Sequence, residues 1–143
     1  PNDLYWRDRK AGGMLIENIL SEGSWNWAVI GIGININQTD FQTLQNRPVS
    51  LKQITGKHFD SINLAHELCD GLEKRFMQLI SQATENIVVD YNDHLFKKGQ
   101  LVKFKKGQVV FEATVSKVYD NGALEIEHGV TETVRHGEVE WLL

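Results

Sequence analysis

A lysine beside two glycines is the first feature of the sequence that could perform chemistry. Lys10 follows Arg7 and Arg9 in the segment RDRKAGGMLIEN, and Gly12 and Gly13 come shortly after it. A lysine can reach a phosphate while bare glycine backbone lets a ligand approach closely. The same residues are also typical of a solvated turn, and taken alone they favour that second interpretation.

A pair of glycines in the segment VIGIGININ is the second candidate. Gly31 and Gly33 are two residues apart, so in a strand they face the same side. Glycines inside a strand mark a close approach of a ligand or of another backbone. Without side chains, the two glycines would leave a flat slot on that face of the strand. Asn35 and Asn37 follow them and would place amide groups at the rim of this slot. The slot suits a planar or elongated ligand, and tight packing of another element over it explains it equally well.

Asn2 and Asp3 form a third polar element, directly before the segment LYW. An aspartate here could position an amine, although an Asx turn is the simpler explanation. The five histidines show no metal-binding spacing, and we therefore assign no metal ligands.

These residues need strands to position them, and the hydrophobic pattern predicts two. Residues 14–20 form one candidate strand. Residues 25–37 form another, whose nearly continuous apolar run predicts burial on both faces. Because a short polar loop joins the two, a hairpin is the expected topology.

Helices and a small barrel are expected to follow. Ser50 is a candidate N-cap for a short helix that ends at Gly56. Apolar residues at helical spacing predict a long helix over about 63–82, and a shorter one is expected over 85–95. From residue 99 onward, five short strand candidates alternate with turn residues, which predicts a small antiparallel barrel.

Length and composition restrict the class of protein. The chain has 143 residues, 41% of them hydrophobic, which is enough for one domain or for one domain and a small module. The net charge of -4 argues against nonspecific nucleic-acid binding, and no apolar run is long enough to span a membrane. The single cysteine, Cys69, forms no internal disulfide, which suggests a reducing compartment. A chain that opens on Pro1 also suggests a piece of something longer.

Three motifs together resemble the biotin protein ligases. PNDLYW is similar to the family's WPND element, RKAGGMLIEN to its lysine-bearing strand, and VIGIGININ to its G-x-G-I-N strand, in the same order and spacing. The resemblance implies an α+β fold. Residues 1–96 would be the C-terminal part of a catalytic domain with a class II synthetase-like mixed sheet and helices. Residues 97–143 would be an SH3-like C-terminal barrel.

The resemblance also implies a two-step ligase reaction. ATP, with Mg²⁺, and biotin would give biotinyl-5′-AMP and pyrophosphate. A lysine of the biotin carboxyl carrier protein of acetyl-CoA carboxylase would then attack this adenylate. Family membership further implies a cytoplasmic location and substrates that are not covalently bound.

Roles for individual residues follow from the matched motifs. Lys10 corresponds to the family's catalytic lysine, and Asp3 would orient the incoming lysine amine. The implied biotin- and adenylate-binding residues are Lys10, Gly12, Gly13, Gly31, Gly33, Asn35 and Asn2.

The chain also departs from the family pattern. The Gly/Arg-rich biotin and phosphate loop and any DNA-binding region are absent from it, so we expect these residues alone to be inactive. We also expect them to self-associate or to bind a complementary N-terminal segment. Leu142 stands about where the family often has an arginine, which leaves an ATP contact of the barrel open. The alternatives are a lipoate-type acyl ligase and a non-enzymatic protein-binding module.

Overall fold

The structure is a computed structural model that describes residues 2–21, 24–41, 47–81 and 84–142. The chain divides into two compact units, Pro1–His66 and Glu67–Leu143, and the division falls inside a helix. The sequence predicts a functional boundary later, between residues 96 and 97. The assignment of 1–96 to a catalytic domain and of 97–143 to a C-terminal domain stays a prediction.

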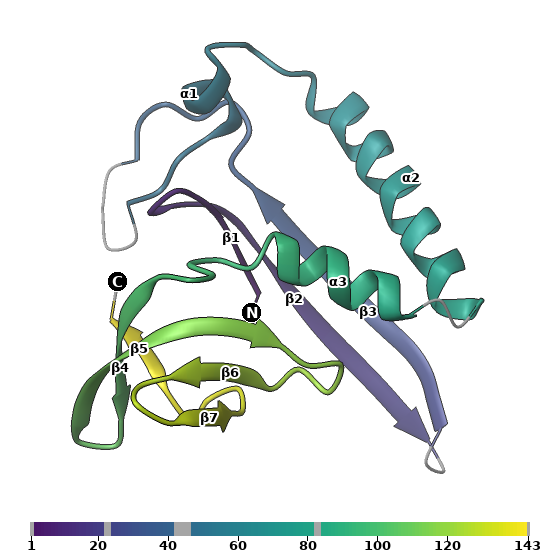
Figure 1. Cartoon of the computed structure of the whole chain (residues 1–143). Helices are drawn as coiled ribbons and strands as arrows, with labels where there is room; N and C mark the ends of the chain where they lie inside the picture. The colour runs from purple at the N-terminus through teal and green to yellow at the C-terminus, as the bar shows by residue number, and fades with distance from the viewer. Residues whose placement is uncertain (1, 22–23, 42–46, 82–83, 143) are drawn as a thin grey trace. The chain divides into compact units, whose positions relative to one another are not determined.

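The first unit contains a three-stranded antiparallel sheet (Figure 1). Its strands, in the order β1-β2-β3, are β1 (Asp3–Trp6), β2 (Arg9–Ser21) and β3 (Ser24–Ile34). The expected hairpin is confirmed, because β2 and β3 pair antiparallel along most of their length. Every pairing between the described strands of this sheet is antiparallel, whereas the resemblance implies a mixed sheet.

The prediction that residues 25–37 are buried on both faces is wrong for this chain. Trp27 is 70% exposed and Val29 is 57% exposed on β3, and Leu20 on β2 is 68% exposed. A continuous apolar run indicates a strand that needs cover on both faces, and the described part of the chain leaves these side chains uncovered. An apolar surface of this kind is typical of an interaction site.

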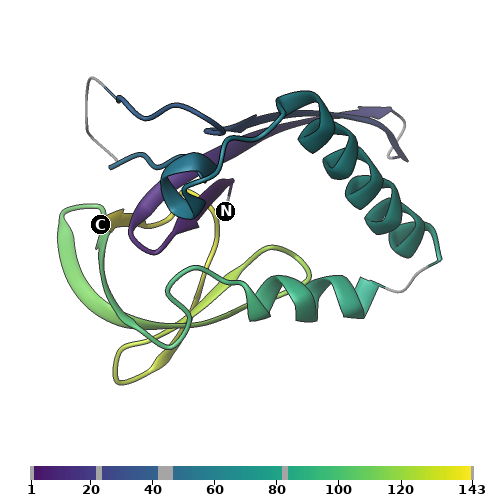
Figure 2. The same cartoon turned by 90° about the horizontal axis from the view of Figure 1, so that it is seen from above.

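The short helix α1 (Leu51–Thr55) is built by its caps. The Ser50 hydroxyl accepts a hydrogen bond from the Gln53 amide at 3.2 Å, and the Gln53 side chain accepts one from the Ser50 amide at 3.3 Å. This reciprocal pair is a capping box. Gly56 ends the helix with a φ of 75°, in the left-handed region that favours glycine. The predicted N-cap and C-cap are therefore confirmed, and Figure 2 shows α1 next to the β1–β2 turn.

Two further helices match the sequence pattern. The long helix α2 (Ser61–Ile80) and the shorter α3 (Thr84–Asp93) confirm the helices predicted over about 63–82 and 85–95, of which position 82 lies outside the described residues. Most apolar side chains of α2 are nevertheless exposed, such as Phe76 at 58%. Among the described residues, no helix is both long enough and apolar enough to cross a membrane.

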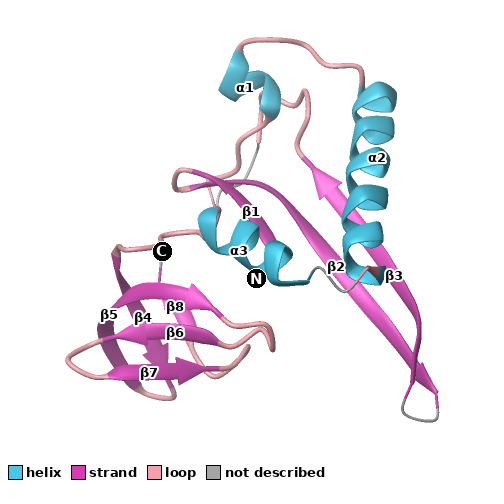
Figure 3. Cartoon of the chain, turned by 45° about the vertical axis from the view of Figure 1, so that its right-hand side comes forward, coloured by secondary structure: helices cyan, strands magenta, loops and turns pink. Residues whose placement is uncertain are grey.

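Five short strands form a second antiparallel sheet, which confirms the expected all-β region (Figure 3). In the order β7-β6-β5-β4-β8, they are β4 (Leu101–Lys106), β5 (Val109–Val118), β6 (Leu124–Glu127), β7 (Thr131–Val134) and β8 (Glu140–Leu142). They enclose one hydrophobic core, made of Val102, Phe104, Ala113, Val115, Ile126 and Val134. This core makes the β4–β8 region a packed element in its own right.

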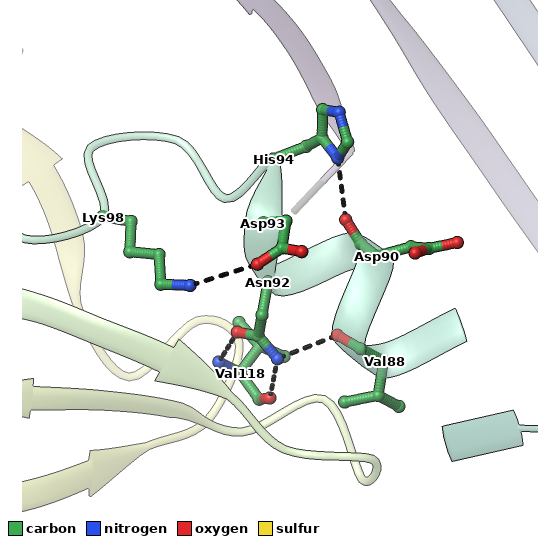
Figure 4. A network of polar contacts seen from close by, with 7 residues as sticks. All are labelled: Val88, Asp90, Asn92, Asp93, His94, Lys98 and Val118. Carbon is green, nitrogen blue, oxygen red and sulfur yellow. Dashed lines mark hydrogen bonds and ion pairs between the residues drawn. The ribbon is translucent and has the colours of Figure 1, made fainter. Parts of the chain in front are cut away.

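An asparagine joins α3 to the strands of the second unit (Figure 4). The Asn92 amide nitrogen donates to the Val118 carbonyl at 2.8 Å and to the Val88 carbonyl at 3.0 Å, and its side-chain oxygen accepts from the Val118 amide at 2.7 Å. Lys98 forms a longer ion pair with Asp93, at 3.7 Å. Because Asn92 satisfies both backbone groups of Val118 at the end of β5, it fixes α3 against that strand.

A glutamate inside the second unit is enclosed by hydrogen-bond donors. Glu125 on β6 is 8% exposed. Ser116 donates to its Oε1 at 2.7 Å, the Tyr119 hydroxyl donates to its Oε2, and Lys117 Nζ lies 3.8 Å from Oε2. The hydrogen bond from Tyr119, and after it the one from Ser116, lowers the pKa of Glu125.

The lowered pKa predicts a loss of stability in acid. A carboxylate whose pKa is lower in the folded state stabilises the fold above the unfolded glutamate pKa of about 4.3. This contribution disappears as the pH falls through the folded pKa. We therefore expect the Tm difference between the wild-type chain and Glu125→Gln to shrink from about pH 7 to about pH 3, as followed by circular dichroism. A difference that does not change with pH would contradict the role of this carboxylate, and Glu112→Gln controls for loss of an exposed one.

Candidate functional site

An ion pair joins two strands of the first unit. Lys10 Nζ on β2 lies 2.6 Å from Asp3 Oδ1 on β1. The two side chains are 31% and 41% exposed, so solvent screens the pair and it adds little to stability. What the pair provides is a cation held at a fixed place, with room for a second negative group to reach it.

A β-bulge places Lys10 on the same face as Asp3. Asp3 lies opposite Gly13, and the β1–β2 register then shifts so that Ala11 has no partner. In a regular strand, residues 10 and 13 would face opposite sides. The extra residue of the bulge re-aims the lysine. A Cβ on Gly13 would consequently lie 3.0 Å from Asp3 Oδ1 and 3.6 Å from Lys10 Cε.

An open floor of glycine backbone adjoins the ion pair. Asp3 lies opposite Gly13, and Gly13 lies opposite Gly33, so all three share one face across the sheet. Gly31 lies opposite Leu15 on the same face. A Cβ on Gly31 or Gly33 would meet a single backbone oxygen, at 3.9 Å. Gly31 and Gly33 are both exposed, so a ligand can approach the bare backbone there.

Gly12 has a different environment. A Cβ at this position would lie 2.5 Å from the Gly33 carbonyl oxygen and 3.2 Å from Ile34 Cα. Both contacts are with backbone, which has little freedom to give way. The close approach of β2 and β3 therefore already requires glycine here, and its role toward a ligand stays a prediction.

Asn35 and Asn2 both form hydrogen bonds with backbone groups of other residues. The Asn35 amide nitrogen donates to the Lys10 carbonyl at 3.4 Å and to the Val49 carbonyl at 3.3 Å. The Asn2 carbonyl accepts from the Met14 amide at 2.7 Å. Asn35 thus connects the lysine-bearing strand to the segment before α1. The roles of both asparagines toward a phosphate or Mg²⁺ remain predictions.

The structure adds three residues that sequence reasoning did not assign to the site. Tyr5 lies opposite Lys10 on β1. Burial raises the pKa of its hydroxyl, and the charge of Asp3 raises that pKa further. Arg9 and Gln53 meet through their side chains. The Ser50–Gln53 spacing is a capping-box pattern, but no sequence signal connects Gln53 to Arg9.

A hollow of about 710 Å³ lies beside the β1–β2 turn. Three arginines and two aspartates contribute to its lining, together with Thr39, Phe41, Pro48 and Gln53; the charged residues are Arg7, Arg9, Arg47, Asp8 and Asp40. The mixed charge gives it no clear preference for an anion.

The described residues do not provide a cage for a metal ion. No group of three or more His, Cys, Asp or Glu side chains lies together in them. Asp3 is the carboxylate at the site, and it already pairs with Lys10.

Comparison with known proteins finds relatives that match the sequence of both units. No family model matches the chain. It is 26% identical over 130 residues to the protein named bifunctional ligase/repressor BirA of Bacillus subtilis (strain 168), and equally to that of Bacillus spizizenii. Each match covers 89% of this chain and 40% of the relative.

Solved structures show the same relationship at the level of the fold. The chain is similar to the apo structure of biotin protein ligase from Aquifex aeolicus, with a TM-score of 0.79 and 22% identity. That match covers 99% of this chain and 62% of the other. The structure of the same ligase in complex with biotin and ATP also gives a TM-score of 0.79.

The chain is thus similar in fold to part of a solved biotin protein ligase, and in sequence to part of two proteins named bifunctional ligase/repressor BirA. It spans 40% of the length of the curated relatives it matches.

Proposed function

We propose that this chain is the C-terminal part of a biotin protein ligase, in which its Asp3–Lys10 pair and glycine floor form one wall of the active site. The observation that supports this most is the bulge, because it brings Lys10, Asp3 and Gly13 onto the face that carries Gly33. A planar ring can rest on the glycine floor while its acidic end reaches the lysine.

The proposed reaction has two steps. In the first, a carboxylate oxygen of biotin attacks the α-phosphorus of ATP, an O–P bond forms, and pyrophosphate leaves. The Lys10 ammonium stabilises negative charge on the biotin carboxylate and on the α-phosphate. MgATP is a substrate here, and its metal brings its own phosphate ligands.

In the second step, a lysine amine of the carrier protein attacks the carbonyl carbon of the adenylate. The amide bond forms, AMP leaves, and the amine gives up a proton. Asp3 lies beside Lys10 and can orient the incoming amine through its carboxylate. The partner on this proposal is the biotin carboxyl carrier protein of acetyl-CoA carboxylase, and the reaction takes place in the cytoplasm.

We further propose that residues 1–143 alone do not form the adenylate. A triphosphate and a biotin ring need donors and cations from more than one wall, and losing part of that arrangement removes most of the advantage of placing both reactants. The exposed apolar side chains of the β2–β3 hairpin support association with a complementary N-terminal segment or with a second copy.

Calorimetry separates this function from its alternatives. The complete ligase should bind biotin, with lipoate giving no comparable heat. Binding of lipoate instead would indicate the lipoate-type ligase. If the protein binds neither, a non-enzymatic protein-binding module becomes the better account.

A further inference from the structure

We propose that Gln53, acting through Arg9, is a positioning residue for Lys10; what Lys10 then does rests on the proposed function. Neither Gln53 nor Arg9 belongs to the glycine floor or to the ion pair. Both lie where the lysine-bearing strand begins, and their contacts fix the backbone there.

Arg9 holds the segment before α1 against the start of β2. Its Nη2 donates to the Pro48 carbonyl at 2.7 Å and to Gln53 Oε1 at 3.2 Å. The next residue completes the attachment, because the Val49 amide donates to the Lys10 carbonyl at 2.9 Å. The consecutive residues Arg9 and Lys10 are therefore hydrogen-bonded to the consecutive residues Pro48 and Val49.

Gln53 contacts three separate segments with one amide group. Its Oε1 accepts from Arg9 and from the Ser50 amide at 3.3 Å, and its Nε2 donates to the Thr39 carbonyl at 2.9 Å. A glutamine that only capped α1 would need the contact with Ser50 alone. The two additional contacts connect α1 to the lysine-bearing strand and to the segment that follows β3.

The position of Lys10 depends in part on this attachment, which adds to its strand pairing with Tyr5. Its side chain has one ion pair, with Asp3, which is partly exposed. Its carbonyl accepts from Val49 and more weakly, at 3.4 Å, from Asn35. If the Arg9–Gln53 contact is lost, Arg9 keeps its hydrogen bond to the Pro48 carbonyl but loses its tie to α1, and the backbone at Lys10 has less support beside its pairing with Tyr5.

The first experiment uses the 143-residue chain and needs no ligase activity. The rate at which an amine-reactive acylating reagent labels Lys10 is measured by peptide mass spectrometry. Gln53→Leu should raise this rate by about threefold to tenfold, because one net hydrogen bond shifts populations on that scale. Gln53→Glu should stay closer to the wild-type rate than Gln53→Leu, since its carboxylate still accepts from Arg9 and Ser50 although it loses the donor to the Thr39 carbonyl. Gln38→Leu is the matched control, because the Gln38 amide donates to Asp40, two residues away.

The second experiment uses the complete ligase. Gln53→Leu should lower kcat for adenylate formation by about tenfold while KM for biotin and ATP stays within about twofold. Arg9→Met combined with Gln53→Leu should cost less than the product of the two single effects, because both break the Arg9–Gln53 contact, although each also removes contacts of its own. Arg9→Met leaves the capping box intact, so it carries the test if Gln53→Leu fails to fold.

The outcomes distinguish the inference from the proposed function. If Gln53→Leu and Arg9→Met both fold and both leave the labelling rate of Lys10 unchanged, the positioning role is overturned. Additive effects of the two substitutions on kcat would also overturn it. Faster labelling of Lys10 together with a wild-type protein that shows no biotin-dependent activity would support the positioning role and refute the proposed function.

Discussion

Replacing Lys10 with alanine in the complete ligase should slow formation of biotinyl-5′-AMP by about two orders of magnitude. Losing one preorganised charge typically costs about 3 kcal/mol of barrier, which corresponds to that factor in rate. The fold should change little, because the Asp3–Lys10 pair is partly exposed and screened. Release of pyrophosphate under saturating biotin and ATP measures the effect.

The control for Lys10→Ala is Lys57→Ala, a change of an exposed lysine that follows α1. It should release pyrophosphate at the wild-type rate. Thermal unfolding of both variants verifies that neither has lost its fold. If Lys10→Ala keeps the wild-type rate, Lys10 is not the catalytic lysine and the proposed active-site wall is misplaced.

Gly33→Val should abolish biotin binding and leave a folded protein. The added side chain would rise from the glycine floor, where a Cβ meets one backbone oxygen at 3.9 Å, so the chain can accept it. The space that a biotin ring would occupy is then filled. Calorimetry with biotin measures the loss, and circular dichroism verifies the fold. An unchanged biotin affinity would show that the glycines serve packing alone.

Gly12→Val, unlike Gly33→Val, should destabilise the fold. Its Cβ would lie 2.5 Å from a backbone oxygen, so the added side chain forces β2 and β3 apart. Overpacking of this kind typically costs about 1–3 kcal/mol. The melting temperature should therefore fall for Gly12→Val and hold for Gly33→Val. Equal losses of stability would contradict the distinction between a closed glycine and an open one.

Local signals were sufficient to predict most of the fold. Ser50 and Gly56 mark the ends of α1 because a cap needs particular side chains at particular places. One of the turn residues expected between the short strands is Gly122, which has a φ of 79° between β5 and β6. These features depend on a few adjacent residues, and the sequence displays them directly.

The arrangement of the site depends on register, which the sequence does not display. The pattern of β2 shows where the glycines are, but the unpaired Ala11 decides that Lys10 and Gly13 share a face. The same register makes Gly12 a packing glycine and Gly33 an open one. The Arg9–Gln53 contact joins residues 44 positions apart, which no local pattern reveals.

The apolar run of β3 shows what a hydrophobic pattern cannot predict. It correctly predicts a strand, but the burial that it predicts is the burial that the strand would need in a complete fold. In this chain, Trp27 and Val29 are exposed. Periodicity therefore predicts the type of element more securely than what covers it.

Transfer of labelled biotin to a purified carrier domain by the complete ligase tests the central proposal most directly. We expect label on the carrier lysine that requires ATP, that lipoate does not replace, and that Lys10→Ala reduces by about two orders of magnitude. The absence of transfer by a folded wild-type protein, or transfer of lipoate in place of biotin, would contradict the proposed function.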